Sequence, residues 1–200
     1  MEFKEIVSSR YATKSFDGKV IPQSKVNELI ELIRFSPSSF NVQPWMIKVI
    51  SDKETKAKIT QAAWNQPQID SSSHLIVFMA NTDVLGNIKK LEDKMAKTSA
   101  EKEKLKGMFD IIHSFAQGLD DSQKLSWTQR QVYLAVGNAL NGAKSLGFDS
   151  CPMEGFDSEA LAKILKLPKN LVPTVLVPIG YANDTPRTKI RFEKNEILFN

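Results

Sequence analysis

The 200-residue sequence contains few of the residues that form disulfides, metal sites or membrane spans. A single cysteine, Cys151, excludes an internal disulfide framework. The two histidines, His74 and His113, lack the spacing of metal ligands, so we expect no metal site. The longest apolar runs, such as 75–80, are far shorter than the roughly 20 residues that cross a bilayer, which argues against membrane insertion. The sequence also has no G-x-G-x-x-G motif, so a Rossmann fold is not indicated.

The N-terminus, MEFKEIVSSR, lacks the basic-then-apolar order of a secretory signal. Together with the lone cysteine, this favours a reducing, cytoplasmic location. Hydrophobic residues make up 42% of the chain and charged residues 25%, which is typical of a globular domain with a sizeable core. We therefore expect residues 1–200 to form one domain.

The net charge of +4 raises the question of nucleic-acid binding. Between residues 89 and 106, however, the lysines alternate with aspartates and glutamates, which is typical of a mixed solvated face and not of a basic stripe. We therefore expect no nucleic-acid partner. A mild positive field would still help to collect anionic small molecules.

Hydrophobic spacing predicts an α+β pattern with short connections. Helices are expected at 22–36, 53–63, 86–117, 123–146 and 158–165. Strands are expected at 46–50, 75–80, 148–151, 174–180 and 197–199. The helix at 123–146 carries small residues near one face that let another helix approach closely, and a dimer seam is one interpretation of them: Ala135, Ala139, Gly142 and Ala143.

Residues 36–45, SPSSFNVQPW, form an uncharged stretch between a predicted helix and a predicted strand. Prolines fix the backbone, while serine and asparagine supply short donors and acceptors, so the stretch suits the wall of a pocket for a planar, polar-edged ligand. An ordinary helix-to-strand connection with a capping serine uses the same residues. Both interpretations remain open from this segment alone.

Residues 9–17, SRYATKSFD, place Arg10 and Lys14 just beyond a short apolar-periodic segment. Arginine offers a planar fork to phosphate oxygens and lysine a compact charge, so the pair suits an anionic ligand. The alternative is a pair of ordinary cations at a helix C-terminus, where they interact favourably with the macrodipole.

Taken together, the chain resembles the nitroreductase family, specifically its oxygen-insensitive nitroreductase and dihydropteridine reductase branch. Besides the two segments above, the resemblance includes four further stretches in the family's order: AAWNQPQI at 62–69, QVYLAVGNALNGAKSLGFD at 131–149, CPMEGFD at 151–157 and PIGYA at 178–182. Their order over nearly the whole chain makes the signal far more specific than any single motif.

The resemblance implies one nitroreductase-like domain over residues 1–200, with a central, mostly antiparallel mixed sheet flanked by helices. It implies an intertwined homodimer with FMN at the subunit interface and a C-terminal segment that reaches the partner's sheet. The implied activity is an FMN-dependent NAD(P)H oxidoreductase that passes hydride by a ping-pong cycle to nitroaromatic, quinone or pteridine acceptors. The alternative is a flavin-binding storage or regulatory protein without turnover.

The resemblance also assigns roles to individual residues. Arg10, Lys189 and Arg191 match cations that bind the FMN phosphate, while Ala12 stands where many relatives have serine. Lys14, Asn65 and Gln68 match residues at the pyrimidine edge of the ring, and Phe40 is a candidate wall of the substrate channel. No side chain is assigned as a general acid or base. The complete implied cofactor site is Arg10, Tyr11, Ala12, Lys14, Pro37, Ser38, Ser39, Asn41, Asn65, Gln68, Met153, Glu154, Gly155, Lys189 and Arg191.

In this assignment, the segment 37–41 comes from the second subunit and packs against the ring. Glu154 and Gly155 lie against the reactive N5 edge, where glycine permits close approach. Cys151 precedes this segment and is either redox-sensitive or a buried thiol that acts as a small hydrophobe.

Overall fold

The computed structural model describes residues 1–199 as helices packed on both faces of a four-stranded antiparallel sheet, which confirms the predicted α+β class. The strands are β1 (Trp45–Ile50), β2 (His74–Asn81), β3 (Asp149–Ser150) and β4 (Leu171–Gly180), in the order β1-β2-β4-β3. The central strand β2 is buried along its whole length, as its continuous apolar run predicts. A parallel bridge between Ala12 and Ser150 adds the mixed character to this sheet.

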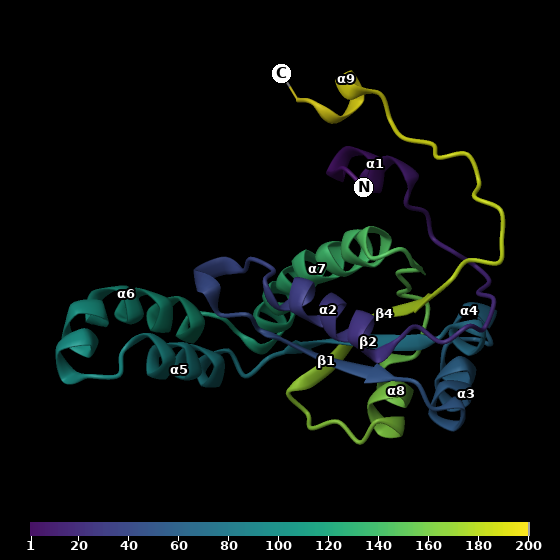
Figure 1. Cartoon of the computed structure of the whole chain (residues 1–200). Coiled ribbons are helices and arrows are strands. Elements are labelled where there is room, and N and C mark those ends of the chain that lie inside the picture. Colours follow the sequence, from purple (N-terminus) through teal and green to yellow (C-terminus); the bar gives the residue numbers. More distant parts are fainter. Residues whose placement is uncertain (200) are drawn as a thin grey trace.

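Helices cover both faces of the sheet (Figure 1). The first face carries α2 (Gln23–Arg34) and the long α7 (Asp121–Ser145), whose apolar residues share one core cluster with β2 and β4. The opposite face carries α3 (Lys53–Ala62), α4 (Pro67–Ser71) and α8 (Ser158–Ile164) around a second cluster. The sequence did not predict α4, a helix of 5 residues.

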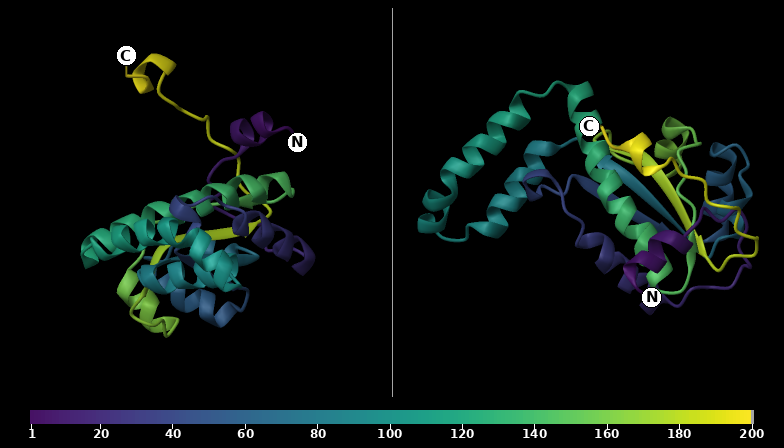
Figure 2. Two further views of the ribbon diagram at one scale, coloured as in Figure 1. Left: turned by 90° about the vertical axis from the view of Figure 1, so that its left-hand side faces the viewer. Right: turned by 90° about the horizontal axis from the view of Figure 1, so that it is seen from above.

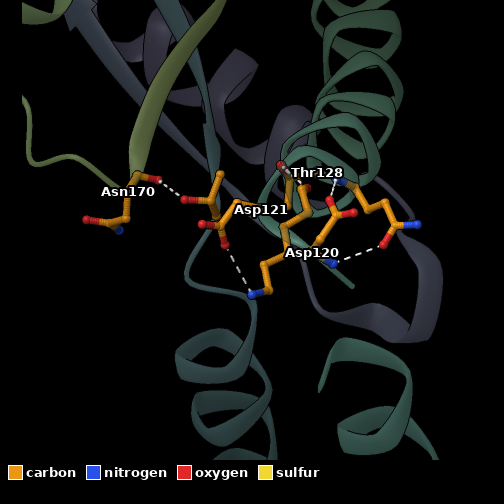
Figure 3. A network of polar contacts seen from close by, with 7 residues as sticks. Asp120, Asp121, Thr128 and Asn170 are labelled. Atoms are coloured by element: carbon orange, nitrogen blue, oxygen red, sulfur yellow. Dashed lines mark hydrogen bonds and ion pairs between the residues drawn. The ribbon is translucent and has the colours of Figure 1, made fainter. Parts of the chain in front are cut away.

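Helix α7 begins at a capping box, visible in Figure 3. The Asp120 carboxylate accepts from the backbone N–H of Gln123, and the Gln123 side chain accepts from the N–H of Asp120. Further along α7, the four small residues Ala135, Ala139, Gly142 and Ala143 are all buried within the chain. A Cβ on Gly142 would lie 3.0 Å from side-chain carbons of Leu29 and Leu32 of α2. The dimer-seam interpretation of this face is therefore wrong, because the small residues let α2 approach.

The region expected as one helix over 86–117 forms two antiparallel helices, α5 (Val84–Met95) and α6 (Ser99–Gln117). A capping box at Thr98 and Glu101 begins the second helix and explains the break. Figure 2 shows this hairpin extending beyond the edge of the sheet. Its inner face packs on Trp127 of α7, where Ile88, Phe109 and Ile112 form a third cluster.

Both ends of the chain lie on the same side of the molecule (Figure 1). Helix α1 (Phe3–Ser9) begins the chain, and an extended C-terminal arm, residues 183–199, passes it before the short helix α9 (Lys194–Ile197). The expected strand at 197–199 is wrong in the single chain: Ile197 ends α9, which begins at a capping box of Glu193 and Glu196, and Leu198 and Phe199 have no regular secondary structure. Within residues 1–199, no helix combines the length and apolarity needed to cross a membrane.

Candidate functional site

A cavity of about 570 Å³ lies between the segment that follows α1 and the C-terminal arm. These two segments, purple and yellow in Figure 1, run side by side although about 170 residues separate them. The cavity is lined by Arg10, Tyr11, Ala12, Lys14, Asp184, Thr185, Arg187, Thr188, Lys189, Ile190 and Arg191. Five of these residues carry a positive charge, so the cavity suits an anion.

Lys189 fastens the arm to the end of α1. Its ammonium group donates to the carbonyl oxygens of Val7 and Ser8, each at 2.8 Å. These carbonyls belong to the last turn of α1, where a cation is favoured by the helix dipole. The contact places Lys189 and Arg191 next to Arg10, which is the C-cap residue of α1. The structure therefore brings together the three cations that the sequence pointed to as phosphate ligands.

The three cations repel one another. Burial lowers the pKa of Arg10, and the nearby charge of Arg191 lowers it further. Burial and the charges of Arg10 and Arg191 likewise lower the pKa of Lys189. Within residues 1–199, none of the three forms an ion pair with a carboxylate. A dianion in the cavity, such as the phosphate group of a ligand, would relieve this repulsion.

Asp184, a residue that sequence reasoning missed, holds the two sides of the cavity together. Its carboxylate accepts from the hydroxyl of Tyr11 at 2.9 Å and from the backbone N–H of Lys14 at 2.8 Å. Burial and the bond to Asp184 raise the pKa of Tyr11, so its phenol stays protonated as a donor. No spacing rule links residues this far apart, so the sequence offered no signal for Asp184. Arg187 was missed as well, although it also lines the cavity.

Lys14 extends from the cavity toward a small buried cluster. Its ammonium group lies 3.5 Å from the sulfur of Cys151, which is fully buried. Burial raises the pKa of the Cys151 thiol, and the charge of Lys14 opposes that effect only in part. Gln68 of α4 is only 3% exposed and donates to the side chain of Gln66 at 3.1 Å. Lys14 and Gln68, both expected at the ring edge, both act on the Cys151 thiol, since each lowers its pKa against the larger effect of burial.

The segment Met153–Gly155 lies beside this cluster. Met153 pairs with Leu176 of β4, and the carbonyl of Gly155 accepts from the Gln66 side chain at 2.7 Å. A Cβ on Gly155 would lie 3.0 Å from Gln66 and 3.1 Å from Trp64, so glycine permits this close packing.

Two further features border the same segment. The hydroxyl of Tyr133, on α7, donates to the Glu154 carboxylate, a contact that the sequence did not predict. Burial and this bond raise the pKa of Tyr133. Asn65 follows the end of α3 with a positive φ of 58°, a left-handed conformation that asparagine adopts more readily than most residues.

The segment 37–41 lies apart from the cavity in the single chain. The N–H of Ser39 donates to the Gln131 side chain on α7 at 2.9 Å, and the Phe40 ring packs 5.3 Å from that of Phe115 on α6. Phe40 and Asn41 have positive φ values of 55° and 57° within the short 3₁₀ turn Ser39–Asn41. Pro37, Ser38, Ser39, Phe40 and Asn41 are not among the residues that line the cavity. One chain therefore brings together the cationic half of the expected site but not this wall.

The other functional residue types add no second candidate. Among residues 1–199, no group of three or more His, Cys, Asp or Glu side chains is arranged to hold a metal ion. His74 is buried beside Ser73, and His113 lies 3.8 Å from Glu92 on the α5–α6 hairpin.

The fold and the cavity define an α+β protein with a cationic cavity between its two terminal segments, and comparisons with known proteins show its family. The nitroreductase family matches residues 7–181 of the chain. The oxygen-insensitive NAD(P)H nitroreductase of Salmonella typhimurium is 33% identical over 195 residues, covering 90% of this chain and 89% of the relative. A Staphylococcus saprophyticus protein named as an NAD(P)H nitroreductase is 32% identical over 206 residues, covering 94% and 92%.

Solved structures show the same fold. A Bacillus subtilis nitroreductase structure has a TM-score of 0.92 and 26% identity, covering 100% of this chain and 98% of that one. An Exiguobacterium sibiricum nitroreductase in complex with FMN has a TM-score of 0.90 and 24% identity, covering 100% and 97%. The chain belongs to the nitroreductase family.

Proposed function

We propose that this protein is an FMN-dependent NAD(P)H oxidoreductase. The observation that carries the proposal is the convergence of Arg10, Lys189 and Arg191 on one cavity from opposite ends of the chain. Family membership supports it, because curated relatives are named NAD(P)H nitroreductases and one structural neighbour holds FMN.

In this proposal, the cationic half of the cavity binds the phosphate of FMN. Arg10 and Arg191 offer guanidinium donors, and Lys189 adds an ammonium charge while it holds the arm against α1. Thr185 and Thr188 line the same cavity and supply hydroxyl groups. Ala12 also lines it but offers no side-chain donor, so a backbone N–H takes the role that serine plays in many relatives.

Lys14, Asn65 and Gln68 would hold the pyrimidine edge of the FMN ring. The backbone of Met153, Glu154 and Gly155 would lie along its N5 edge. Tyr133 positions Glu154 there through its hydroxyl.

A second copy of the chain completes the site. The segment 37–41 of that copy forms the remaining wall, because in a single chain it packs on α6 and α7, away from the cavity. The arm supports this arrangement. It exposes large apolar side chains that a monomer leaves in water, namely Ile190, Phe192, Ile197, Leu198 and Phe199.

When bound, FMN supplies the redox chemistry: it accepts a hydride from NAD(P)H and passes the electrons to a small acceptor such as a nitroaromatic, quinone or pteridine. The protein binds the phosphate, orients the ring and places a positive charge at the edge where reduction concentrates negative charge. In this proposal, Phe40 of the second copy, which is 43% exposed in the single chain, forms part of the wall that the acceptor meets. We assign no side chain as general acid or base.

Anaerobic reduction tests this proposal. FMN-loaded protein should lose its visible flavin absorbance when NADH or NADPH is added under argon, and should regain it on addition of menadione or nitrofurazone. Steady-state rates should give the parallel double-reciprocal lines of a ping-pong cycle. A flavin-binding storage protein would be coloured but would not oxidise NAD(P)H in the steady state. Protein that takes up no FMN would contradict both interpretations.

A further inference from the structure

The only side-chain hydrogen bond of the Lys14 ammonium within residues 1–199 is to the sulfur of Cys151, at 3.5 Å. We propose that Cys151 is a positioning residue, which holds the Lys14 ammonium toward the flavin ring without cancelling its charge. This inference rests on the proposed function and deepens it by naming a residue that adjusts the reduction potential.

The geometry fixes Lys14 at both of its ends. The backbone N–H of Lys14 donates to Asp184 at 2.8 Å, and its ammonium group lies against the sulfur. Between these points is a flexible stem, and ordering a lysine side chain costs rotamer entropy. A contact that orders the stem before the cofactor binds reduces this cost at the time of binding.

The chemistry of the hydrogen-bond acceptor beside Lys14 matters as much as its position. A carboxylate at this place would form an ion pair with Lys14 and neutralise the charge that faces the ring. A thiol is a weak, neutral acceptor. Burial raises the pKa of Cys151, so the group stays a thiol near neutral pH and the positive charge of Lys14 is preserved. Cys151 therefore orients the cation at no electrostatic cost.

A purely structural role for Cys151 makes different predictions. The side chain packs in the core cluster with Met153 and Leu176, among others. If packing were its only role, Cys151→Val would be tolerated, while Cys151→Ser would place a hydroxyl in an apolar core. If Cys151 positions Lys14, the two substitutions should rank the other way for FMN binding: Cys151→Val should change it and Cys151→Ser should not. Serine keeps an acceptor near Lys14, and valine removes it.

The experiment compares the affinities of each variant for oxidised and reduced FMN, with thermal unfolding as a separate measure of stability. For Cys151→Val we expect the binding of reduced FMN to weaken by roughly three- to tenfold relative to oxidised FMN, the effect of losing one modest hydrogen bond. Cys151→Ser should retain the wild-type ratio even where its melting temperature falls. Lys14→Met should show a larger loss, and adding Cys151→Val to Lys14→Met should change the ratio no further.

An unchanged ratio in Cys151→Val would overturn the inference, as would equal and additive losses in the Lys14→Met background. If Cys151→Ser does not fold, the comparison of Cys151→Val, Lys14→Met and the double variant decides the matter alone. Wild-type protein that binds no FMN would instead refute the proposed function, so the two failures are distinguishable.

Discussion

Single side chains at the site act in pairs that join distant segments. Asp184 connects the C-terminal arm to Tyr11 and Lys14, and Lys189 connects the arm to the carbonyls that end α1. The sequence singled out Arg10 and Lys14 as candidate anion ligands, because cations at a loop suit phosphate, and both line the cavity. Asp184, Tyr133 and Arg187 were not recognisable, because their roles depend on contacts between elements far apart in the chain.

A buried histidine makes the stability of the protein depend on pH. His74 begins β2 and is 5% exposed. The Ser73 hydroxyl accepts from the N–H of Ile21, so its own proton is available for Nδ1 of the neutral His74 ring. Burial lowers the pKa of His74 in the folded state, and the charge of Lys56 lowers it further. The unfolded chain therefore binds a proton more readily than the folded chain.

Because the folded-state pKa is the lower one, we expect the contribution of His74 to stability to be complete above the unfolded pKa of about 6.5. As the pH falls below that value, the free energy of unfolding should decrease by at most about 1.4 kcal/mol per pH unit. Urea unfolding between pH 5 and 7.5 measures the slope in about half-unit steps. His74→Gln should flatten this slope. A steeper slope in His74→Gln would contradict the assignment.

Among the elements, the C-terminal arm shows most clearly how far sequence reasoning extends. Its apolar end was correctly recognised as unusual, but the strand expected at 197–199 is absent from the single chain. There, α9 forms because its capping box is a local interaction, whereas a strand at this place needs a partner outside the chain. Ile197, Leu198 and Phe199 remain exposed as a result.

If the arm binds a second copy, charging its end should weaken the dimer and leave the subunit folded. Burying a large apolar side chain contributes about 1.5–3 kcal/mol, so Leu198→Asp combined with Phe199→Asp should raise the dimer dissociation constant on the order of a hundredfold or more. Sedimentation equilibrium measures the constant, and circular dichroism checks the fold. Val20→Asp, at an apolar residue that is 75% exposed elsewhere, is the matched control. A dimer that tolerates the double substitution would show that the arm does not hold it together.

The helices and strands of the core were predictable to within a few residues, because long apolar periodic segments dominate local preferences. The α5–α6 break was missed although its signal, Thr98 followed by Glu101, is present in the sequence. The sequence correctly indicated that the small residues of α7 allow close helix packing, but it did not identify the helix that packs there. Small residues indicate a close approach and do not say whether the approaching helix belongs to the same chain, as α2 does here.

At the scale of the whole molecule, the fold brings both chain ends to one cavity. The sheet edge at β3 carries the segment after α1 through the bridge of Ala12 to Ser150, and β4 leads directly into the arm. The cations that line this cavity thus come from one chain, while the segment 37–41 packs elsewhere. A site shared between two copies of the chain requires this separation between the cations and the segment 37–41 of one chain.

The central claim is that the cations of this cavity bind the phosphate of FMN. The most direct measurement compares the dissociation constants of FMN and of riboflavin, which lacks the phosphate, for wild-type protein, Arg191→Ala and the control Lys163→Ala on the exposed surface of α8. Arg191→Ala should lose about 1.5–3 kcal/mol of FMN binding, roughly tenfold to a hundredfold, while its riboflavin binding and both constants of Lys163→Ala stay unchanged. Equal losses for FMN and riboflavin in Arg191→Ala, or no loss for either, would contradict the account.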